Sequence, residues 1–210
     1  LRRMLEFPNT RDTAEARART EMYRAQAERR KATTGSVDFE AMLGDLGLVL
    51  TFGVSKSEDL DRVTELVQRT NQFNTTTIRY DRSQLEQFIE SDQHEIYVAN
   101  LADRFGDFGL VVVVIIERQE GSVVFDSFVM SCRAMGYGVE KVALQKVIEL
   151  EGFEKSFQGI FRPTERNDPA SSLFEEAGFI AEDGAEGSWH RSALKAPAAP
   201  PAWIRVEERL

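Results

Sequence analysis

Three consecutive strand-like segments constrain the fold of this chain more than any other feature. Residues 95–101, 110–118 and 123–131 are rich in β-branched and aromatic side chains, and a short connection ending in Glu120 and Gly121 separates the last two. An acidic residue followed by glycine suits a tight hairpin, so the segments predict an antiparallel meander. Helical patterns lie before and after the meander. The sequence therefore predicts an α+β (mixed α/β) domain and excludes a doubly wound parallel sheet.

Shorter elements are predicted on both sides of the meander. Before it, the apolar spacing predicts one strand and two helices, and after it a long helix that starts near Gly138, two more strands and another helix. The predicted strands lie near 46–55, 157–161 and 188–194, and the predicted helices near 57–70, 85–89, 139–150 and 168–177.

The charge distribution separates the start of the chain from the rest. The whole chain has a formal charge of −9, whereas residues 1–31 hold nine Lys and Arg against five Asp and Glu, a local charge of +4. Residues 10–31 contain no Gly or Pro and are rich in Ala and Arg, which predicts one exposed helix. We therefore expect an N-terminal helical linker over 1–45, the folded domain over 46–194 and an Ala- and Pro-rich tail over 195–210.

The composition excludes several classes of protein. One cysteine and two histidines provide no disulfide framework and too few ligands for a zinc site of the usual kind, so we expect no metal. The negative charge argues against general binding to nucleic acid or to anionic membranes. The longest apolar run, 110–116, is far shorter than the roughly 20 residues that span a bilayer, and no secretory signal is visible. We expect a cytoplasmic protein with a free thiol at Cys132.

A glycine-rich connection after the third strand of the meander is the first candidate site. Glycines allow several backbone N–H groups to point into one hollow at a helix N-terminus, which is a binding site for phosphate. A connection without any ligand fits the same pattern, because short glycine motifs recur by chance. The candidate cofactor-binding residues in this connection are Ser131, Arg133, Ala134, Met135, Gly136, Tyr137 and Gly138.

The R-x-x-G-x-G pattern of residues 133–138 resembles the pyrophosphate loop of the GNAT superfamily of N-acetyltransferases. Asn167 and the sequence LFEEAGF at 173–179 are similar to the closing motif of that superfamily. The resemblance implies a GNAT-like fold, with a central, mostly antiparallel sheet that is flanked by helices and splayed open at its middle. It also implies that the pantetheine arm of coenzyme A or of a carrier protein lies between two strands. Asn167 becomes a candidate contact of that arm, and a helix N-cap is the alternative.

A narrower resemblance points to the C-terminal part of FkbH-like proteins. It is carried by residues 64–80, 101–111, 128–140 and 161–167. Those proteins join a HAD-type phosphatase domain to a GNAT-like domain, and load a glyceryl unit from 1,3-bisphosphoglycerate onto an acyl carrier protein in polyketide biosynthesis. The resemblance implies an acyl carrier protein as partner and a HAD-type domain upstream in the parent chain. Because no D-x-D-x-T/V signature occurs here, phosphate removal is not assigned to this chain.

Cys132 is the candidate catalytic nucleophile. A single cysteine at the end of the strand that borders the thioester in GNAT folds could accept an acyl group, and a buried small apolar residue is the alternative. His94 is a candidate base, with a surface histidine as the alternative.

Many acetyltransferases have a tyrosine that protonates the leaving thiolate, where this sequence has Phe174. Exchange between two thioesters needs less acid help, because both thiols have similar pKa values.

The substrate candidates are Asn71, Phe73 and Asn74, in an uncharged loop suited to a polyol, and Arg104 as an anion contact. For the loop residues the alternative is a loop in contact with solvent, and for Arg104 it is a turn held by carboxylates.

Three functions stay open. We favour an acyltransferase that transfers a glyceryl or related short acyl unit to a carrier-protein phosphopantetheine thiol, with Cys132 as the candidate carrier of the acyl group. An acetyl-CoA-dependent N-acetyltransferase and a non-catalytic docking module for the carrier are the alternatives.

Overall fold

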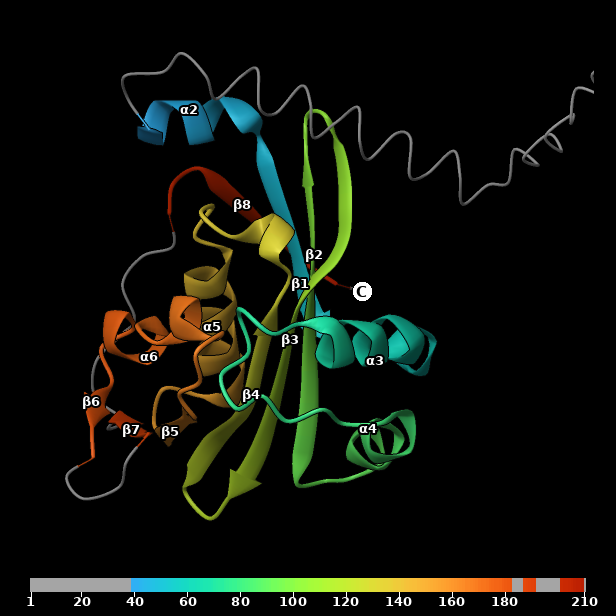
Figure 1. Ribbon diagram of the computed structural model, residues 1–210, viewed down its shortest axis with the longest axis vertical. Coiled ribbons are helices and arrows are strands. Elements are labelled where there is room, and N and C mark those ends of the chain that lie inside the picture. The colour runs from blue at the N-terminus through green and yellow to red at the C-terminus, as the bar shows by residue number, and fades with distance from the viewer. Residues whose placement is uncertain (1–38, 183–186, 192–200, 210) are drawn as a thin grey trace, which may run out of the picture.

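One eight-stranded, mostly antiparallel sheet with helices on both faces forms the body of the molecule (Figure 1). The computed structural model describes residues 39–182, 187–191 and 201–209. The predicted basic helix over 10–31 lies outside these residues. The predicted class, α+β (mixed α/β) with a central, mostly antiparallel sheet, is confirmed.

Five helices and three 3₁₀ turns accompany the eight strands in the described residues. None of the helices in the described ranges is long and apolar enough to cross a membrane. The helices are α2 (Phe39–Leu46), α3 (Leu60–Arg69), α4 (Arg82–Ile89), α5 (Val139–Glu151) and α6 (Leu173–Glu176), with 3₁₀ turns η1 (Ser57–Asp59), η2 (Cys132–Ala134) and η3 (Asp168–Ala170). The strands are β1 (Leu48–Val54), β2 (His94–Asp103), β3 (Gly106–Gln119), β4 (Ser122–Met130), β5 (Ser156–Ile160), β6 (Ile180–Ala181), β7 (Ser188–Arg191) and β8 (Ile204–Glu208).

The predicted meander is the centre of the sheet. Strands β2, β3 and β4 pair antiparallel in sequence order, and Gly121 has a φ of +74° in the hairpin between β3 and β4. Glycine adopts such a positive φ without steric cost. Among the described residues the strand order is β6-β7-β5-β4-β3-β2-β1-β8, and the parallel pairs are β4–β5 and β1–β8.

Helices cover both faces of the sheet because β3 is apolar on both sides. Successive side chains of a strand point to opposite faces. Val112 and Val114 accordingly pack in the cluster that contains α5 and α6, whereas Val113 and Ile115 pack in the cluster that contains α3 and α4. The two helical layers therefore form separate cores, and any site between them must lie where the sheet opens.

Both ends of the described chain differ from the predicted boundaries. The end of the segment predicted as a tail forms β8, which pairs in parallel with β1 and buries Ile204. The Ala- and Pro-rich residues before β8 concealed this strand, since its partner lies far away in the sequence. At the other end, Leu43 and Leu46 of α2 are buried in the core, so the folded domain starts before residue 46.

Candidate functional site

The sheet opens between β4 and β5. These parallel strands pair from Ser122 opposite Ser156 to Phe125 opposite Gly159, and β4 then continues to Met130 without β5 as a neighbour. This divergence is the splay that the resemblance implies.

Residues 73–76 fill the gap between the diverging strands. The carbonyl of Phe73 accepts a hydrogen bond from the Met130 amide (2.9 Å), and the Thr75 amide donates to the Phe128 carbonyl (3.1 Å). On the other side, the Thr75 carbonyl accepts from the Arg162 amide (2.7 Å). A backbone edge buried inside a protein needs such partners. The expected place of a pantetheine arm between two strands is therefore occupied by the chain itself.

Two predicted site residues, Asn74 and Asn167, hold this segment in place, and both side chains are completely buried. Asn74 Oδ1 accepts from the amides of Thr76 (3.2 Å) and Thr77 (2.8 Å). Asn167 Nδ2 donates to the carbonyls of Asn74 and Arg162, both at 2.9 Å. The Asn167 side chain makes no capping hydrogen bond to η3. Both asparagines thus bond the chain's own backbone in this structure. The third loop residue in the gap, Phe73, is buried against Phe128.

The glycine-rich connection has the backbone conformation that its sequence predicts. Gly136 and Gly138 have φ values of +85° and +82°, which glycine adopts readily, and Gly138 is the N-cap of α5. The indole Nε1 of Trp203 donates to the carbonyl of Tyr137 (2.8 Å), so the C-terminal segment packs against this turn. Ala134 is buried in the core.

The connection faces two different cavities. Ser131, Cys132 and Arg133 line a cavity of about 650 Å³ beside α3, which we call the α3 cavity. Met135 and Gly136 line a second cavity of about 210 Å³ between α5 and α6, which we call the α5 cavity. The predicted cofactor-binding loop is therefore divided between two sites.

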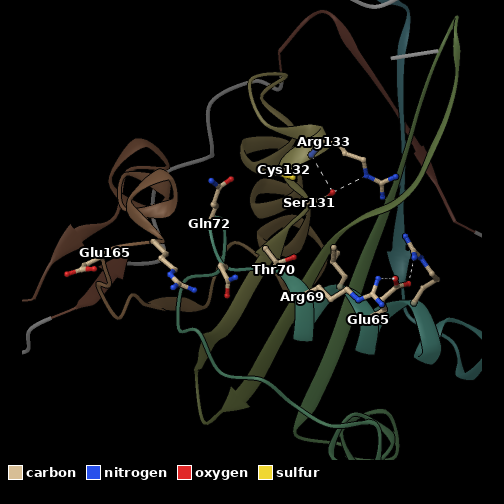
Figure 2. Close-up of a pocket in the computed structure, with 12 residues that line it drawn as sticks. Glu65, Arg69, Thr70, Gln72, Ser131, Cys132, Arg133 and Glu165 are labelled. Atoms are coloured by element: carbon tan, nitrogen blue, oxygen red, sulfur yellow. Dashed lines mark hydrogen bonds and ion pairs between the residues drawn. The ribbon is translucent and has the colours of Figure 1, made fainter. Parts of the chain in front are cut away.

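The α3 cavity contains an exposed thiol among positive charges. Cys132 is exposed, and the cavity walls carry four arginines but only two glutamates, in a protein whose overall charge is negative. Figure 2 shows Cys132 and Ser131 near Arg69 and Thr70 of the α3 end, with Glu165 on the opposite side. The lining residues are Arg62, Glu65, Leu66, Arg69, Thr70, Asn71, Gln72, Ser131, Cys132, Arg133, Glu165 and Arg166.

The α5 cavity has the opposite character. An ion pair between Lys141 and Glu176 (2.8 Å) joins α5 to α6 at this cavity, and both residues line it. Glu140 also lines it, and Glu140 Oε2 is buried without a hydrogen-bonding partner among the described residues. Burial raises the pKa of the Glu140 carboxyl, despite the hydrogen bond that it accepts from its own backbone N–H. This cavity is therefore a poor site for a diphosphate.

The structure does not bring His94 to Cys132. His94 stacks on Phe88 (4.4 Å between ring centroids), and its Nδ1 lies 3.1 Å from Ser91 Oγ. It pairs with Glu117 of β3, which pairs with Val124 near the start of β4, whereas Cys132 follows the far end of β4. The six steps of strand from Val124 to Met130 alone span roughly 20 Å at about 3.3 Å each. His94 is thus not placed to act as a base for Cys132.

Arg104 also lies away from both cavities, on the exposed hairpin between β2 and β3. Its guanidinium lies over the Phe105 ring (4.7 Å). Asp103 Oδ1 holds this hairpin by accepting from the amides of Phe105 (2.9 Å) and Gly106 (3.0 Å). The arrangement is a turn held by a carboxylate, which is the alternative that the sequence left open.

Phe174 lies in the core and has no contact with the α3 cavity. Its ring packs against Phe125 and Phe179 at 6.0 and 5.3 Å, and it is completely buried. A Cβ at Gly159 would come within 2.5 Å of this ring, so the glycine leaves room for it. The position therefore supplies no acid. Over the described ranges, no group of three or more His, Cys, Asp and Glu is arranged to hold a metal ion.

Of the four arginines of the α3 cavity, only Arg133 was among the site residues predicted from sequence. Arg62 and Arg69 are separated by two helical turns and lie on the same side of α3, and Arg166 comes from the loop after β5. The seven-residue spacing was a usable signal for a shared helix face. The approach of Arg166 was not, because it depends on how the loop after β5 folds.

Comparison with known proteins adds information on the fold. No family model matches the chain, and no curated protein matches it significantly. A putative GNAT-family acetyltransferase from Desulfovibrio desulfuricans superposes with a TM-score of 0.53 at 15% identity, covering 69% of this chain and 99% of that chain. A domain from Methanocaldococcus jannaschii gives 0.52 at 13% identity, with 67% and 95% coverage.

The ribosomal-protein-S18-alanine N-acetyltransferase from Escherichia coli gives a TM-score of 0.50 at 13% identity, and the match covers 67% of this chain and 88% of that chain. At such identities the likeness concerns the fold and not the activity. The mixed sheet, its divergence between β4 and β5 and these similar structures together show that the chain has a GNAT-like fold.

Proposed function

We propose that this domain is an acyltransferase that carries a short acyl group, glyceryl or a related unit, as a thioester on Cys132. The acyl group then passes to the phosphopantetheine thiol of an acyl carrier protein. The observation that carries this proposal is the exposed Cys132 thiol in a cavity with an excess of arginines. A thiol needs to be accessible to act as a nucleophile, whereas a purely structural cysteine is usually buried.

The proposed reaction has two displacements. In the first, the Cys132 thiolate forms a bond to the acyl carbonyl carbon, and the donor's leaving group departs with the electron pair of the broken bond. In the second, the carrier's thiolate attacks the same carbon, the bond to Cys132 breaks, and Cys132 leaves as a thiolate, while the proton that the carrier thiol lost passes to solvent. Both partners of the second step are thiols of similar pKa, so this exchange needs no strong acid. Phe174 offers none, which agrees with this chemistry.

The arginines would favour an anionic donor. Arg133 Nε lies 3.3 Å from Ser131 Oγ, which holds its side chain next to Cys132. A positive charge beside the reacting carbonyl stabilises the negative charge that develops on the carbonyl oxygen. Within the parent polypeptide, we propose that a HAD-type phosphatase domain lies upstream and prepares the acyl unit, as the resemblance to FkbH-like proteins implies.

An acetyl-CoA-dependent N-acetyltransferase is the second candidate, favoured by the likeness to the S18-alanine N-acetyltransferase. The filled gap between β4 and β5 and the acidic α5 cavity count against it. Calorimetric titration with acetyl-CoA separates the two: tight binding together with acetylation of an amine would favour the second candidate over the first.

Intact-mass spectrometry tests the proposal. The protein is incubated with the glyceryl thioester of N-acetylcysteamine and then analysed with and without hydroxylamine, which cleaves thioesters. We expect one glyceryl unit on the wild-type protein, sensitive to hydroxylamine, and none on Cys132→Ala. Transfer to carrier protein at the normal rate by Cys132→Ala would contradict the covalent role.

A further inference from the structure

The two cavities beside the glycine-rich connection are separated by the chain. Asn71 and Gln72 line the α3 cavity, whereas Phe73 lines the α5 cavity. Residues 73–76 between them are at most 5% exposed and are bonded to β4 and to the Arg162 amide. A ligand in one cavity therefore has no open path through the sheet to a ligand in the other.

This separation decides where a carrier's arm can reach Cys132. We propose that the phosphopantetheine arm lies in the α3 cavity, with its thiol at Cys132 and its phosphate at Arg69 and Arg166. The inference rests on the proposed function and identifies the binding site of its second substrate. It places the arm on the face of the sheet opposite to α5.

The charges of the two cavities support this assignment. In the α5 cavity, Lys141 is already paired with Glu176, and Glu140 adds a second carboxylate. A phosphate there would find the lysine of the lining already paired and would lie beside the buried carboxyl of Glu140, which is unfavourable in a partly buried site. In the α3 cavity the arginines outnumber the glutamates by two.

The arginines of the α3 cavity differ in how far their charges are already neutralised by nearby carboxylates. Arg69 Nη1 contacts Glu65 Oε1 at 2.7 Å, and Arg62 contacts the other oxygen of the same carboxylate, so one positive charge remains in this group. Among the described residues, the guanidinium of Arg166 makes no hydrogen bond or ion pair. Arg133 lies beside Cys132 and is bonded to Ser131, so it is near the thiol end of the arm.

The other residues that line the α3 cavity suit the middle of the phosphopantetheine arm. Thr70, Asn71 and Gln72 line the cavity with uncharged donors and acceptors, and Leu66 adds an apolar contact. A pantetheine arm has two amide groups separated by short apolar stretches, and such a ligand is matched by a few polar groups in an apolar setting. The donor and the carrier would then use the same cavity in turn.

Disulfide exchange at Cys132 tests the site without any acyl group. Phosphopantethine, the disulfide of phosphopantetheine, reacts with the Cys132 thiolate. A protein–phosphopantetheine disulfide forms, the original S–S bond breaks, and one phosphopantetheine thiolate leaves and takes up a proton. Unphosphorylated pantethine is the matched probe. Since charge-assisted hydrogen bonds to phosphate are worth about 1.5–3 kcal/mol, a wild-type rate ratio of roughly tenfold or more in favour of phosphopantethine is expected at low salt.

The variants locate the origin of this preference. Arg69→Gln combined with Arg166→Gln should bring the ratio close to one, because the ratio cancels any change in thiol reactivity that both probes share, and circular dichroism shows whether the variant is folded. Arg205→Gln, at a 70% exposed arginine on β8 that does not line the cavity, is the control for loss of a surface positive charge and should keep the full ratio. Lys141→Gln in the α5 cavity should also keep it.

Two results would overturn the inference. One is a wild-type ratio near one at low salt. The other is loss of the ratio in Lys141→Gln but not in the arginine variant, which would place the phosphate in the α5 cavity. Neither result depends on whether Cys132 accepts a glyceryl group, so the inference and the proposed function can fail separately.

Discussion

At the scale of single residues, Phe174 limits the chemistry that the domain can perform. It is completely buried between Phe125 and Phe179, so its position is filled by apolar packing. A residue that protonates a leaving thiolate needs both a proton and access to the sulfur. Phe174 has neither, and the exposed Cys132 carries the proposed transfer without it.

Replacing Phe174 with tyrosine should therefore destabilise the protein without improving transfer. The new hydroxyl would be buried without a partner, which costs about 1–3 kcal/mol. Urea unfolding measures this loss. Phe153→Tyr, at a 45% exposed position, is the matched control and should change stability by less than about 0.5 kcal/mol. A Phe174→Tyr protein as stable as the wild type would mean that this ring is accessible after all.

The roles of single residues were only partly predictable from sequence. The position of Cys132 directly after a strand was predicted from the local pattern, whereas its exposure was not, because a buried residue fitted the same pattern. The buried positions of Asn74 and Asn167 do not, because their hydrogen bond joins residues 93 positions apart. A polar loop in a sequence suggests solvent or substrate contact, and only the folded sheet shows that this loop closes a gap.

At the scale of elements, the segment 73–76 acts as an additional strand-like piece in the sheet. Thr75 contributes most, since its amide, carbonyl and hydroxyl all make hydrogen bonds across the gap. Thr75 Oγ1 accepts from the amide of Phe128 (3.0 Å), and both residues are completely buried. The segment therefore closes the gap through specific bonds and not through loose contact.

Thr75→Val keeps the shape of the side chain but removes the acceptor of the Phe128 amide. The variant should lose about 1–3 kcal/mol of stability, because a buried donor remains unsatisfied. Hydrogen exchange should show faster exchange at the Phe128 and Met130 amides. In the control Thr64→Val, the lost hydroxyl donates only to the Leu60 carbonyl within α3, so little change is expected. Unchanged exchange at both amides in Thr75→Val would show that the segment is held by other contacts.

The elements themselves followed from sequence more readily than their connections. The meander and α5 are long and strongly patterned, so the predictions there are confirmed. Strand β8 was not predicted, because its five residues are too few to show a periodic pattern of apolar side chains. They form a strand through their pairing with β1, which lies far away in the sequence.

At the scale of the whole molecule, a buried carboxylate links the sheet to its helical layer at the end remote from the α3 cavity. Glu151 of α5 accepts hydrogen bonds from Arg118 of β3 (2.7 Å) and from the Tyr97 hydroxyl of β2 (2.7 Å). Lys155 also donates to it (3.1 Å). Burial alone would raise the pKa of Glu151, but these hydrogen bonds outweigh it and lower the pKa to about 2.

This lowered pKa predicts how stability changes with pH. Because the pKa of Glu151 is lower in the folded state than its ordinary value of 4.5, its contribution is complete above pH 4.5 and is lost as the pH falls toward 2. The shift corresponds to about 3 kcal/mol. Unfolding free energies measured between pH 2 and 6 should fall less steeply with acid in Glu151→Gln than in the exposed control Glu175→Gln. Equal slopes in the two variants would rule out this role.

The fold places the accessible thiol of Cys132 and the arginines around it on one face of the sheet, whose gap is filled by residues 73–76. The central claim is that Cys132 holds the acyl group between donor and carrier. The most direct measurement isolates the glyceryl-loaded protein free of donor, mixes it with phosphopantetheinylated carrier protein, and follows both masses with time. We predict that the glyceryl mass leaves the Cys132 peptide and appears on the carrier's phosphopantetheine thiol at the same rate. Retention of the glyceryl unit on Cys132 while added donor still acylates the carrier would contradict it.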